Sequence, residues 1–378
     1  MKNKLLLSSA LVSGLMVGAT VANAQTSITG DLAVAYRALS FTGGGLNSRQ
    51  GIGRESQLNV QNKGKLNNGM DYAAGFSLEF DGQNINSTRG FSSANANGLS
   101  GDTRNTEAAS ISNENLYFDL IAGSTTFTIG VDHVQNSTSA VAPQIVDVYD
   151  HASVALGAYA TNQLGAKTKE YAHVGIVQAI PGTGLTASLI YAPQGGEFGH
   201  NDQEVSTGGQ RNPSYELGIA GSDIGGVKGL SARYFYNKEK ATPGGDGVAA
   251  VTDLKGKAYG VAYNFRTVAV GFDRMETNRT AGTTATEVEV QSNRYGVTYA
   301  VNKELSVGLV YVKSDIGSGQ AGASDEKIKS VQVGYNLGPV ALTADYSKIT
   351  NIAGRSTDSD PFKPQDGKQG QVRLSTKF

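Results

Sequence analysis

Four histidines are the side chains of this sequence best suited to acid–base catalysis, and they are His133, His151, His173 and His200. A histidine acts as a general base or activates a nucleophile when a carboxylate or a serine lies within hydrogen-bond reach. His173 is the one histidine inside a predicted strand, where it lies between Tyr171 and Gly175. A lone histidine on such a wall is more often solvated than catalytic, so we expect that this chain is not an enzyme.

Two of these histidines directly follow an aspartate, in the dipeptides Asp132-His133 and Asp150-His151. Carboxylates in polar loops can bind calcium, so a metal site at these dipeptides is conceivable. Acidic residues in a solvated loop do not require a metal, however. We therefore expect no metal and no cofactor.

The segments that must position these side chains alternate with a period of two, which places one class of side chain on each face of a β-strand. In one such segment Tyr72, Phe76 and Leu78 alternate with small or charged residues such as Asp71 and Glu79. This pattern predicts an all-β protein whose strand boundaries are good to about 3 residues. The sixteen predicted strands are 26–39, 54–63, 70–80, 113–121, 125–131, 170–180, 185–193, 214–221, 230–239, 256–265, 268–277, 288–300, 305–315, 326–336, 340–350 and 370–378.

Short and long connections alternate between these strands. The short ones include 122–124, 181–184, 301–304 and 337–339, and the long polar ones include 40–53, 81–112, 132–169, 195–213 and 351–369. Every second connection of an antiparallel meander lies at the same end, so short turns gather at one end and long loops at the other. A soluble β-sandwich has no reason to separate its loops by length, whereas an outer-membrane barrel does so.

The first 24 residues have the features of a cleaved signal peptide. Lys2 and Lys4 precede an apolar stretch that ends in Ala22-Asn23-Ala24, so we expect an exported mature chain, 25–378, that forms a single domain. Without these two lysines, 30 of the 32 basic residues remain against 33 acidic ones. This balance argues against a nucleic-acid partner, which would favour a basic excess. Cysteine is absent, so the exported chain is stabilised without disulfides.

A sheet in lipid must close on itself, because lipid cannot satisfy the polar groups of an open edge. Sixteen strands about 4.8 Å apart and tilted by about 45° give a barrel with a backbone diameter of roughly 35 Å. Side chains cannot fill a lumen of that width, so water must. The polar inward face and apolar outward face therefore predict a water-filled outer-membrane channel for passive diffusion of small hydrophilic solutes and ions.

Two hairpins and the last residue resemble a known family, the sixteen-stranded general diffusion porins of Gram-negative bacteria. The segment 57–76, with its turn Lys63-Gly64-Lys65-Leu66-Asn67-Asn68-Gly69, resembles the second hairpin of that family. The hairpin from Asn115 to Gly130 is similar to the one that precedes the family's long third loop. Terminal Phe378 matches the residue that the barrel-assembly machinery reads. The resemblance spans the whole mature chain.

The resemblance implies a homotrimer whose third extracellular loop folds into the lumen and narrows it. The corresponding segment, 132–169, is the longest loop here, and it lacks the Pro-Glu-Phe type of tip found in the best-known members. Acidic residues of this loop are implied to face basic residues of the wall, so that a transverse field orients permeating solutes. The loop candidates are Asp132, Asp147 and Asp150. The wall candidates, placed inward by strand parity, are Arg37, Arg54, Arg233, Arg294 and Arg373.

Other functions of the same barrel stay open at the level of the sequence. A solute-selective channel, for an anion such as phosphate or for a sugar, would favour a ladder of basic side chains or a row of aromatic ones, and neither stands out. An outer-membrane enzyme or an adhesin barrel is a further alternative. The expected partners are outer-membrane lipid and lipopolysaccharide, small hydrophilic solutes, and the barrel-assembly machinery during biogenesis.

Overall fold

The computed structural model describes the strands, their short turns and part of the longer connections. The described residues are 24–42, 49–81, 110–134, 140–146, 168, 172–193, 213–239, 251–281, 286–316, 325–352 and 366–378, with the side chains of 49, 53–55, 80–81, 110–114, 251–253, 279–281, 286–288 and 316 excepted. The predicted signal peptide lies outside these residues, apart from Ala24. Its cleavage therefore stays a prediction.

The described residues form sixteen β-strands, as the alternation of the sequence predicted. They are β1 (Gln25–Thr42), β2 (Arg49–Lys65), β3 (Asp71–Asp81), β4 (Ser110–Ala122), β5 (Thr125–Val131), β6 (His173–Ile180), β7 (Leu185–Ala192), β8 (Ser214–Ser222), β9 (Leu230–Glu239), β10 (Val251–Phe265), β11 (Val268–Ala281), β12 (Thr286–Ala300), β13 (Leu305–Ile316), β14 (Glu326–Asn336), β15 (Val340–Thr350) and β16 (Asp366–Lys377). A short 3-10 turn, η5 (Ile224–Gly226), lies in the connection from β8 to β9. Within the described ranges, no helix has the length and apolar character needed to cross a membrane.

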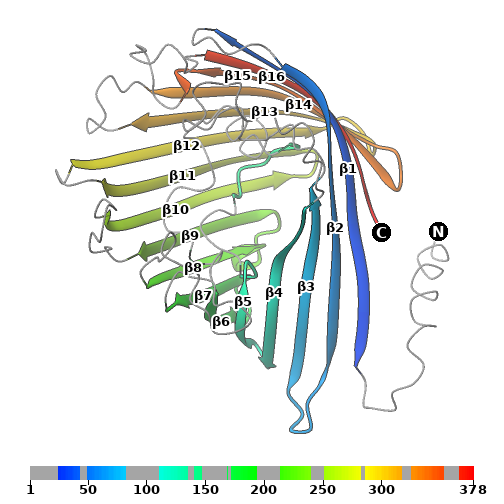
Figure 1. Ribbon diagram of the computed structural model, residues 1–378, viewed down its shortest axis with the longest axis vertical. Coiled ribbons are helices and arrows are strands. Elements are labelled where there is room, and N and C mark those ends of the chain that lie inside the picture. The colour runs from blue at the N-terminus through cyan, green and yellow to red at the C-terminus, as the bar shows by residue number, and fades with distance from the viewer. Residues whose placement is uncertain are drawn as a thin grey trace.

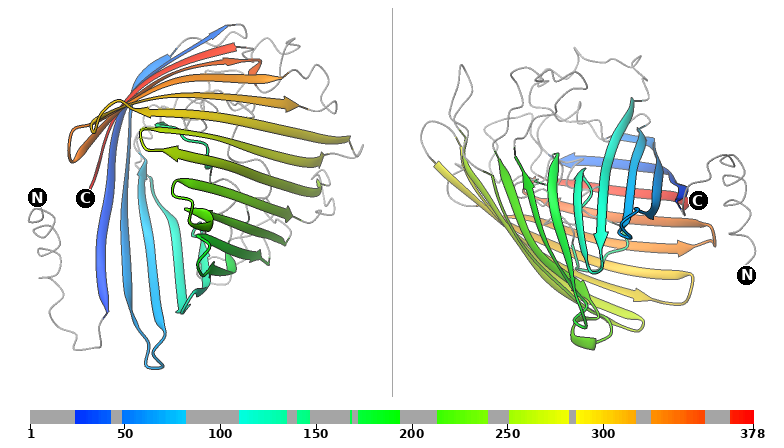
Figure 2. Two further views of the ribbon diagram at one scale, coloured as in Figure 1. Left: turned by 180° about the vertical axis from the view of Figure 1, so that it is seen from behind. Right: turned by 90° about the horizontal axis from the view of Figure 1, so that it is seen from below.

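Each strand pairs antiparallel with the next, and β1 pairs with β16, so the sheet closes into a barrel (Figures 1 and 2). The closing ladder runs from Asp31 opposite Lys377 to Thr42 opposite Asp366. Closure leaves no strand edge without a partner, which is the condition for a sheet to stand in lipid. The tight connections have the turn chemistry that short hairpins require. Gly123, for example, has a φ of 61° between β4 and β5.

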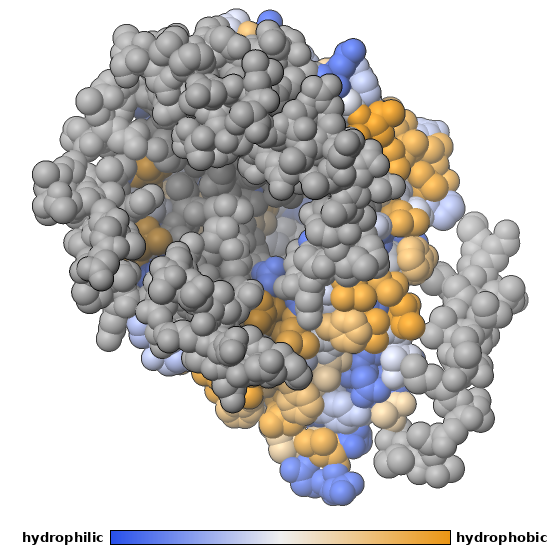
Figure 3. Space-filling view, viewed as in Figure 1, coloured by the Kyte–Doolittle hydropathy of each residue, from blue (hydrophilic) through white to orange (hydrophobic). Residues whose placement is uncertain are grey.

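The two faces of the wall differ in the way that the alternation predicted. Large apolar side chains are exposed on the outward face, among them Val34, Phe118, Ile129 and Leu309. Figure 3 shows the hydrophobic surface on the outside of the wall, with the strands placed as in Figure 1. The inward face carries buried polar residues such as Gln371 and Ser347. A soluble core would reverse this arrangement, so the outward face is suited to lipid.

Several strands extend further toward the long connections than predicted. β2 begins at Arg49 rather than at 54, β10 begins at Val251 rather than at 256, β11 ends at Ala281 rather than at 277, and β16 begins at Asp366 rather than at 370. Polar residues and glycines are frequent in these extensions and obscure the alternation, although the pairing with the neighbouring strands continues. Apolar periodicity therefore marks the lipid-facing part of a strand and not its full length.

Candidate functional site

Residues 140–146 follow β5 in the chain but dock against the inner wall on β11 to β14. In Figure 1 this segment is the teal trace inside the barrel, far from β5. Four of its backbone N–H groups, at Val141, Ala142, Ile145 and Val146, are hydrogen-bonded to side chains of the wall. Backbone amides that leave water need acceptors, and two wall residues supply them.

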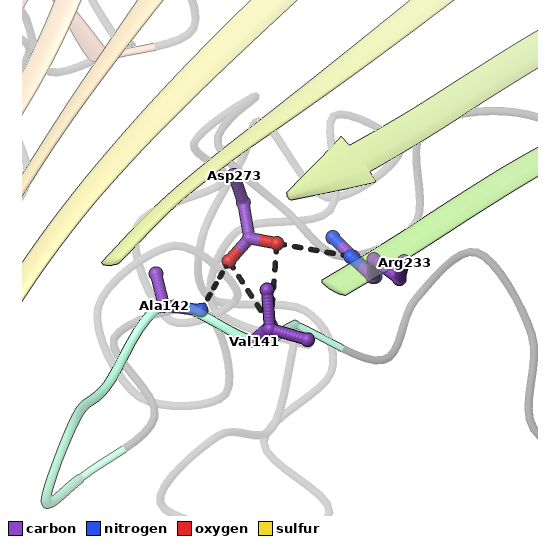
Figure 4. A network of polar contacts seen from close by, with 4 residues as sticks. All are labelled: Val141, Ala142, Arg233 and Asp273. Carbon is purple, nitrogen blue, oxygen red and sulfur yellow. Dashed lines mark hydrogen bonds and ion pairs between the residues drawn. The ribbon is translucent and has the colours of Figure 1, made fainter. Parts of the chain in front are cut away.

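Asp273 of β11 is the first of these acceptors (Figure 4). Its Oδ2 accepts from the amides of Val141 at 3.1 Å and Ala142 at 2.6 Å, and its Oδ1 also lies 3.2 Å from the Val141 nitrogen. Arg233 of β9 donates from Nε to Oδ1 at 2.9 Å, and both side chains of this ion pair are almost fully buried. A carboxylate with a charged partner and two amide donors is well compensated for its loss of water.

A glycine between the two partners makes this ion pair possible. Arg233 lies opposite Gly260 of β10, and Gly260 lies opposite Asp273, so the pair spans an intervening strand. A Cβ atom on Gly260 would overlap the Asp273 carboxylate. Because Gly260 has no side chain, Asp273 and Arg233 can contact each other across β10.

Gln332 of β14 is the second acceptor. Its Oε1 accepts from the amides of Ile145 at 2.7 Å and Val146 at 3.1 Å, and its Nε2 donates to the carbonyl oxygen of Val146 at 2.6 Å. A primary amide has both a donor and an acceptor, so it can pair with the backbone much as a neighbouring strand would. Gln332 is fully buried beneath the segment.

Glycines of the wall give the segment the room to approach closely. Pro143 packs over Gly271 and Gly296, which lie directly opposite each other on β11 and β12. A Cβ on Gly296 would overlap the Pro143 backbone, and one on Gly271 would lie 2.8 Å from Pro143 Cδ. Ile145 contacts Gly308 of β13 and Gly334 of β14 in the same way. The docking surface is therefore a floor of four glycines flanked by Asp273 and Gln332.

The first residues of the same connection are held at β4 by a different kind of contact. The His133 ring stacks on Tyr117, with ring centroids 3.6 Å apart and planes 1° from parallel. Its Nε2 lies 2.9 Å from Asp119 Oδ2. Tyr117 in turn hydrogen-bonds with Gln61 of β2 and lies against Gly75 of β3. Side chains thus fix the beginning of the connection, while backbone amides fix residues 140–146.

Of the predicted wall arginines, Arg233 is the one whose described contacts place it beside the docked segment. Arg37 is buried on the inward face of β1 and donates from Nε to Gln371 Oε1 at 2.8 Å. Arg294 is buried on β12, directly opposite Asp273. Arg373 alternates with the outward-facing Val372 and Leu374 of β16, which places it on the inward face. These four residues lie on the inward face, and their part in a constriction stays a prediction.

The backbone of Arg54 pairs with Val34 of β1. Its side chain lies outside those that the structure describes, so its inward placement stays a prediction.

The three loop acids have different outcomes. Asp132 is the first residue after β5, with a φ of 48°, so it lies at the beginning of the connection, next to the His133 contact with β4. Asp147 and Asp150 lie outside the described residues. Among the residues that are described, no group of three histidines, aspartates and glutamates is arranged to hold a metal ion.

Asp273, Gln332 and the four glycines were not predicted from the sequence. The predicted site paired acids of the loop with bases of the wall, whereas in residues 140–146 the loop supplies backbone donors and the wall supplies acceptors. Inward-facing glycines on consecutive strands were the signal that could have indicated a close approach of backbone. That signal becomes readable only when the register is known.

Terminal Phe378 closes the barrel. Its N–H donates to the Gly30 carbonyl oxygen at 3.0 Å, and its own carbonyl accepts from the Gly30 N–H at 2.9 Å. The ring lies against Gly30, where a Cβ would overlap it, and stays 61% exposed. An exposed aromatic ring at the closing seam is accessible to a protein that acts on the barrel from outside.

A family profile and several solved structures match this chain. A profile of the family described as Gram-negative porin matches residues 8–354. No curated protein matches the sequence.

Solved structures of low sequence identity share the fold. The chain is similar to the anion-selective porin from Comamonas acidovorans, with 14% identity, a TM-score of 0.65, and coverage of 94% of this chain and 100% of that one. It is similar to Salmonella typhi OmpF in complex with daunomycin, with 13% identity, a TM-score of 0.62, and coverage of 93% and 97%. It is also similar to the trimer form of OmpT, an outer membrane protein of Vibrio cholerae, with 12% identity, a TM-score of 0.58, and coverage of 94% and 100%.

Proposed function

The chain belongs to the Gram-negative porin family and is a diffusion channel of the outer membrane, and we propose that it is a general one, which passes small hydrophilic solutes and ions without a strong preference. Charges of both signs on the inward face support this proposal. Arg37 and Arg373 are balanced by carboxylates such as Asp119 and Asp345, and Arg233 is neutralised by Asp273. Mixed charges with internal partners produce a weaker selective field than a ladder of one sign.

We further propose that the connection after β5 forms the constriction of the channel. The docked segment 140–146 is the observation that supports this proposal. The connection leaves β5 at Asp132, and its residues 140–146 lie against the wall of β11 to β14, where they occupy part of the lumen cross-section. Asp147 and Asp150 follow it directly in the chain. We propose that they line the constriction together with Arg294 and Arg37, and that Asp132 acts at the beginning of the connection.

A second candidate function is an anion-selective channel. One similar structure is named an anion-selective porin, and four of the arginines that the structure describes face inward. The buried ion pair of Arg233 with Asp273 argues against it, because that arginine is not available to a permeating anion. We also propose that the chain has no catalytic role, since the His133 ring is stacked on Tyr117 and its Nε2 contacts Asp119.

The assembled form is a further part of the proposal. A similar solved structure is described as a trimer, and we propose a homotrimer for this chain. We also propose that the exposed Phe378 ring is read by the barrel-assembly machinery, and that outer-membrane lipid and lipopolysaccharide surround the folded barrel. Deletion of Phe378 is expected to reduce the amount of folded protein in the outer membrane. Normal amounts of folded barrel would contradict this role.

Single-channel recording in planar bilayers tests the proposed function. Openings in groups of three, a reversal potential near zero under a salt gradient and no block by added phosphate or sugars would support a trimeric general channel. A strongly anionic reversal potential or block by phosphate at low concentration would replace it with the selective candidate. Absence of conductance from correctly folded protein would contradict the channel itself.

A further inference from the structure

Three lysines form a continuous row on the outer surface of the barrel. Lys329 of β14 lies directly opposite Lys348 of β15, and Lys348 lies directly opposite Lys368 of β16. All three are exposed, whereas their chain neighbours Ser330 and Ser347 are buried on the inward face. The row therefore points away from the lumen.

The row stands at the upper boundary of the apolar surface. Lys348 lies two residues before the end of β15 at Thr350, on the side of the long connections. The next outward-facing pair toward the short-turn end is Val331 and Tyr346, which lie opposite each other and are more than half exposed. Because long connections mark the extracellular end of an outer-membrane barrel, the lysines lie at the level of the lipid headgroups of the outer leaflet.

The neighbouring sector of the same surface carries charges that are compensated. Arg274 Nε lies 2.7 Å from Glu276 Oε1, and Lys313 Nζ lies 2.6 Å from Asp315 Oδ1 and 2.9 Å from Asp325 Oδ2. The hydrogen bond from Lys313 lowers the pKa of the Asp325 carboxyl below its usual value. Arg274 and Lys313 in this sector therefore have acidic partners within the chain.

The lysine row has no such compensation within the described part of the chain, where none of its three ammonium groups forms an ion pair. The nearest outward acid along β16 is Asp366, two residues before Lys368, and its Oδ1 accepts the Asn351 amide at 3.0 Å. Like charges directly opposite on neighbouring strands destabilise a sheet. Three in a row, about 4.8 Å apart, form a site complementary to a compact polyanion.

We propose that Lys329, Lys348 and Lys368 bind the phosphate groups of an anionic lipid of the outer leaflet, that is, of phosphorylated lipopolysaccharide. The inference rests on the outer-membrane placement of the channel and names the surface through which it contacts that lipid. The acyl chains would lie along Val331, Tyr346 and Val372 below the row, and the phosphates would replace the missing counter-charges.

Binding of purified lipopolysaccharide to the full folded protein tests the proposal. The variant K329Q/K348Q/K368Q is compared with the wild type and with K63Q/K228Q/K303Q, which removes three exposed lysines near the short-turn end. Each lysine near an anionic lipid surface contributes about fivefold, so the first variant is expected to bind about 100-fold more weakly. The second variant and the wild type are expected to bind equally.

Enzymatically dephosphorylated lipopolysaccharide is the chemical control. It should bind the wild type as weakly as the intact lipid binds the triple variant of the row. Equal binding of intact lipid to all three proteins would overturn the proposal, and so would strong binding of the dephosphorylated lipid. Dissociation of the variant into monomers in lipid-free detergent would also overturn it, because the row would then be a subunit contact. Conductance, recorded in parallel, separates these outcomes from a failure of the channel proposal.

Discussion

The connection after β5 is held at two places, and they use opposite chemistry. At its beginning, His133 contacts Asp119 and Tyr117 of β4 through its own side chain. At residues 140–146 it offers backbone amides to Asp273 and Gln332 over a floor of glycines. The first attachment depends on residues of the loop, and the second depends on residues of the wall. Changes to the wall should therefore move this segment more than most changes to the segment itself.

Asp273→Ala is expected to have the largest effect. It leaves the buried Arg233 guanidinium without its carboxylate and the amides of Val141 and Ala142 without an acceptor. Loss of one partner of a buried ion pair costs about 3–5 kcal/mol of folding free energy. We expect a lower urea midpoint and a higher, noisier single-channel conductance. Asp345→Asn, which removes a buried wall carboxylate hydrogen-bonded to Ser347, controls for the loss of an inward charge and should not raise the noise of the conductance.

Gly296→Ala is expected to have the next largest effect on conductance. The new methyl group would overlap the Pro143 backbone, so the segment must leave its site, at a cost of about 1–3 kcal/mol as for other overpacked positions. Conductance should rise with little loss of folded protein. Gly370→Ala, with no atom within 4 Å of the new Cβ, is the matched control. Equal conductance of the two variants would show that the glycine floor does not determine the position of the segment.

Gln332→Leu should also raise conductance, but by a smaller amount. The substitution removes the acceptor of the Ile145 and Val146 amides, and each unsatisfied buried amide costs about 1–3 kcal/mol, less where lumen water can replace the acceptor. Asp273 still holds Val141 and Ala142, so we expect a partial rise in conductance. The double variant with Asp273→Ala should exceed either single variant, and a double variant no different from Asp273→Ala alone would mean that Gln332 contributes nothing.

His133→Phe should have the smallest effect. The phenyl ring keeps the stack on Tyr117 but loses the contact with Asp119, a partly exposed pair that is expected to contribute about 0.5–1 kcal/mol. Conductance close to that of the wild type is expected, with a small decrease in the urea midpoint. If His133→Phe raised conductance more than Gln332→Leu does, the attachment at β4 would hold the connection more strongly than the wall does, which would contradict the comparison.

The sequence predicted the barrel well because its signal is local. Alternating residues such as Phe76 and Leu78 report which face meets lipid, and short turns such as that at Gly123 mark each hairpin. The same local signal placed Arg37 and Arg233 on the inward face. The placement of Arg54 stays a prediction, because its side chain lies outside those that the structure describes.

The docking site could not be predicted because it depends on contacts between distant residues. Gly271 and Gly296 become neighbours through strand register, and Val141 meets Asp273 across 132 residues of chain. The groups that bind Asp273 are backbone amides, so they cannot be recognised from the residue types of the loop. The sequence pattern therefore indicated Arg233 but neither the Asp273 carboxylate nor the segment whose amides that carboxylate accepts.

The most direct test of the docked position is a disulfide between the segment and the wall. The chain contains no cysteine, so Ile145→Cys with Gly334→Cys introduces a single pair. A Cβ at position 334 lies 2.9 Å from Ile145 Cγ2, within reach of a disulfide whose Cβ atoms are about 3.5–4.5 Å apart. We predict rapid cross-linking under mild oxidation with conductance unchanged, and none for Ile145→Cys with Ala33→Cys on β1. Failure of the first pair to cross-link, or equal cross-linking of both, would contradict the docking of residues 140–146 on β11 to β14.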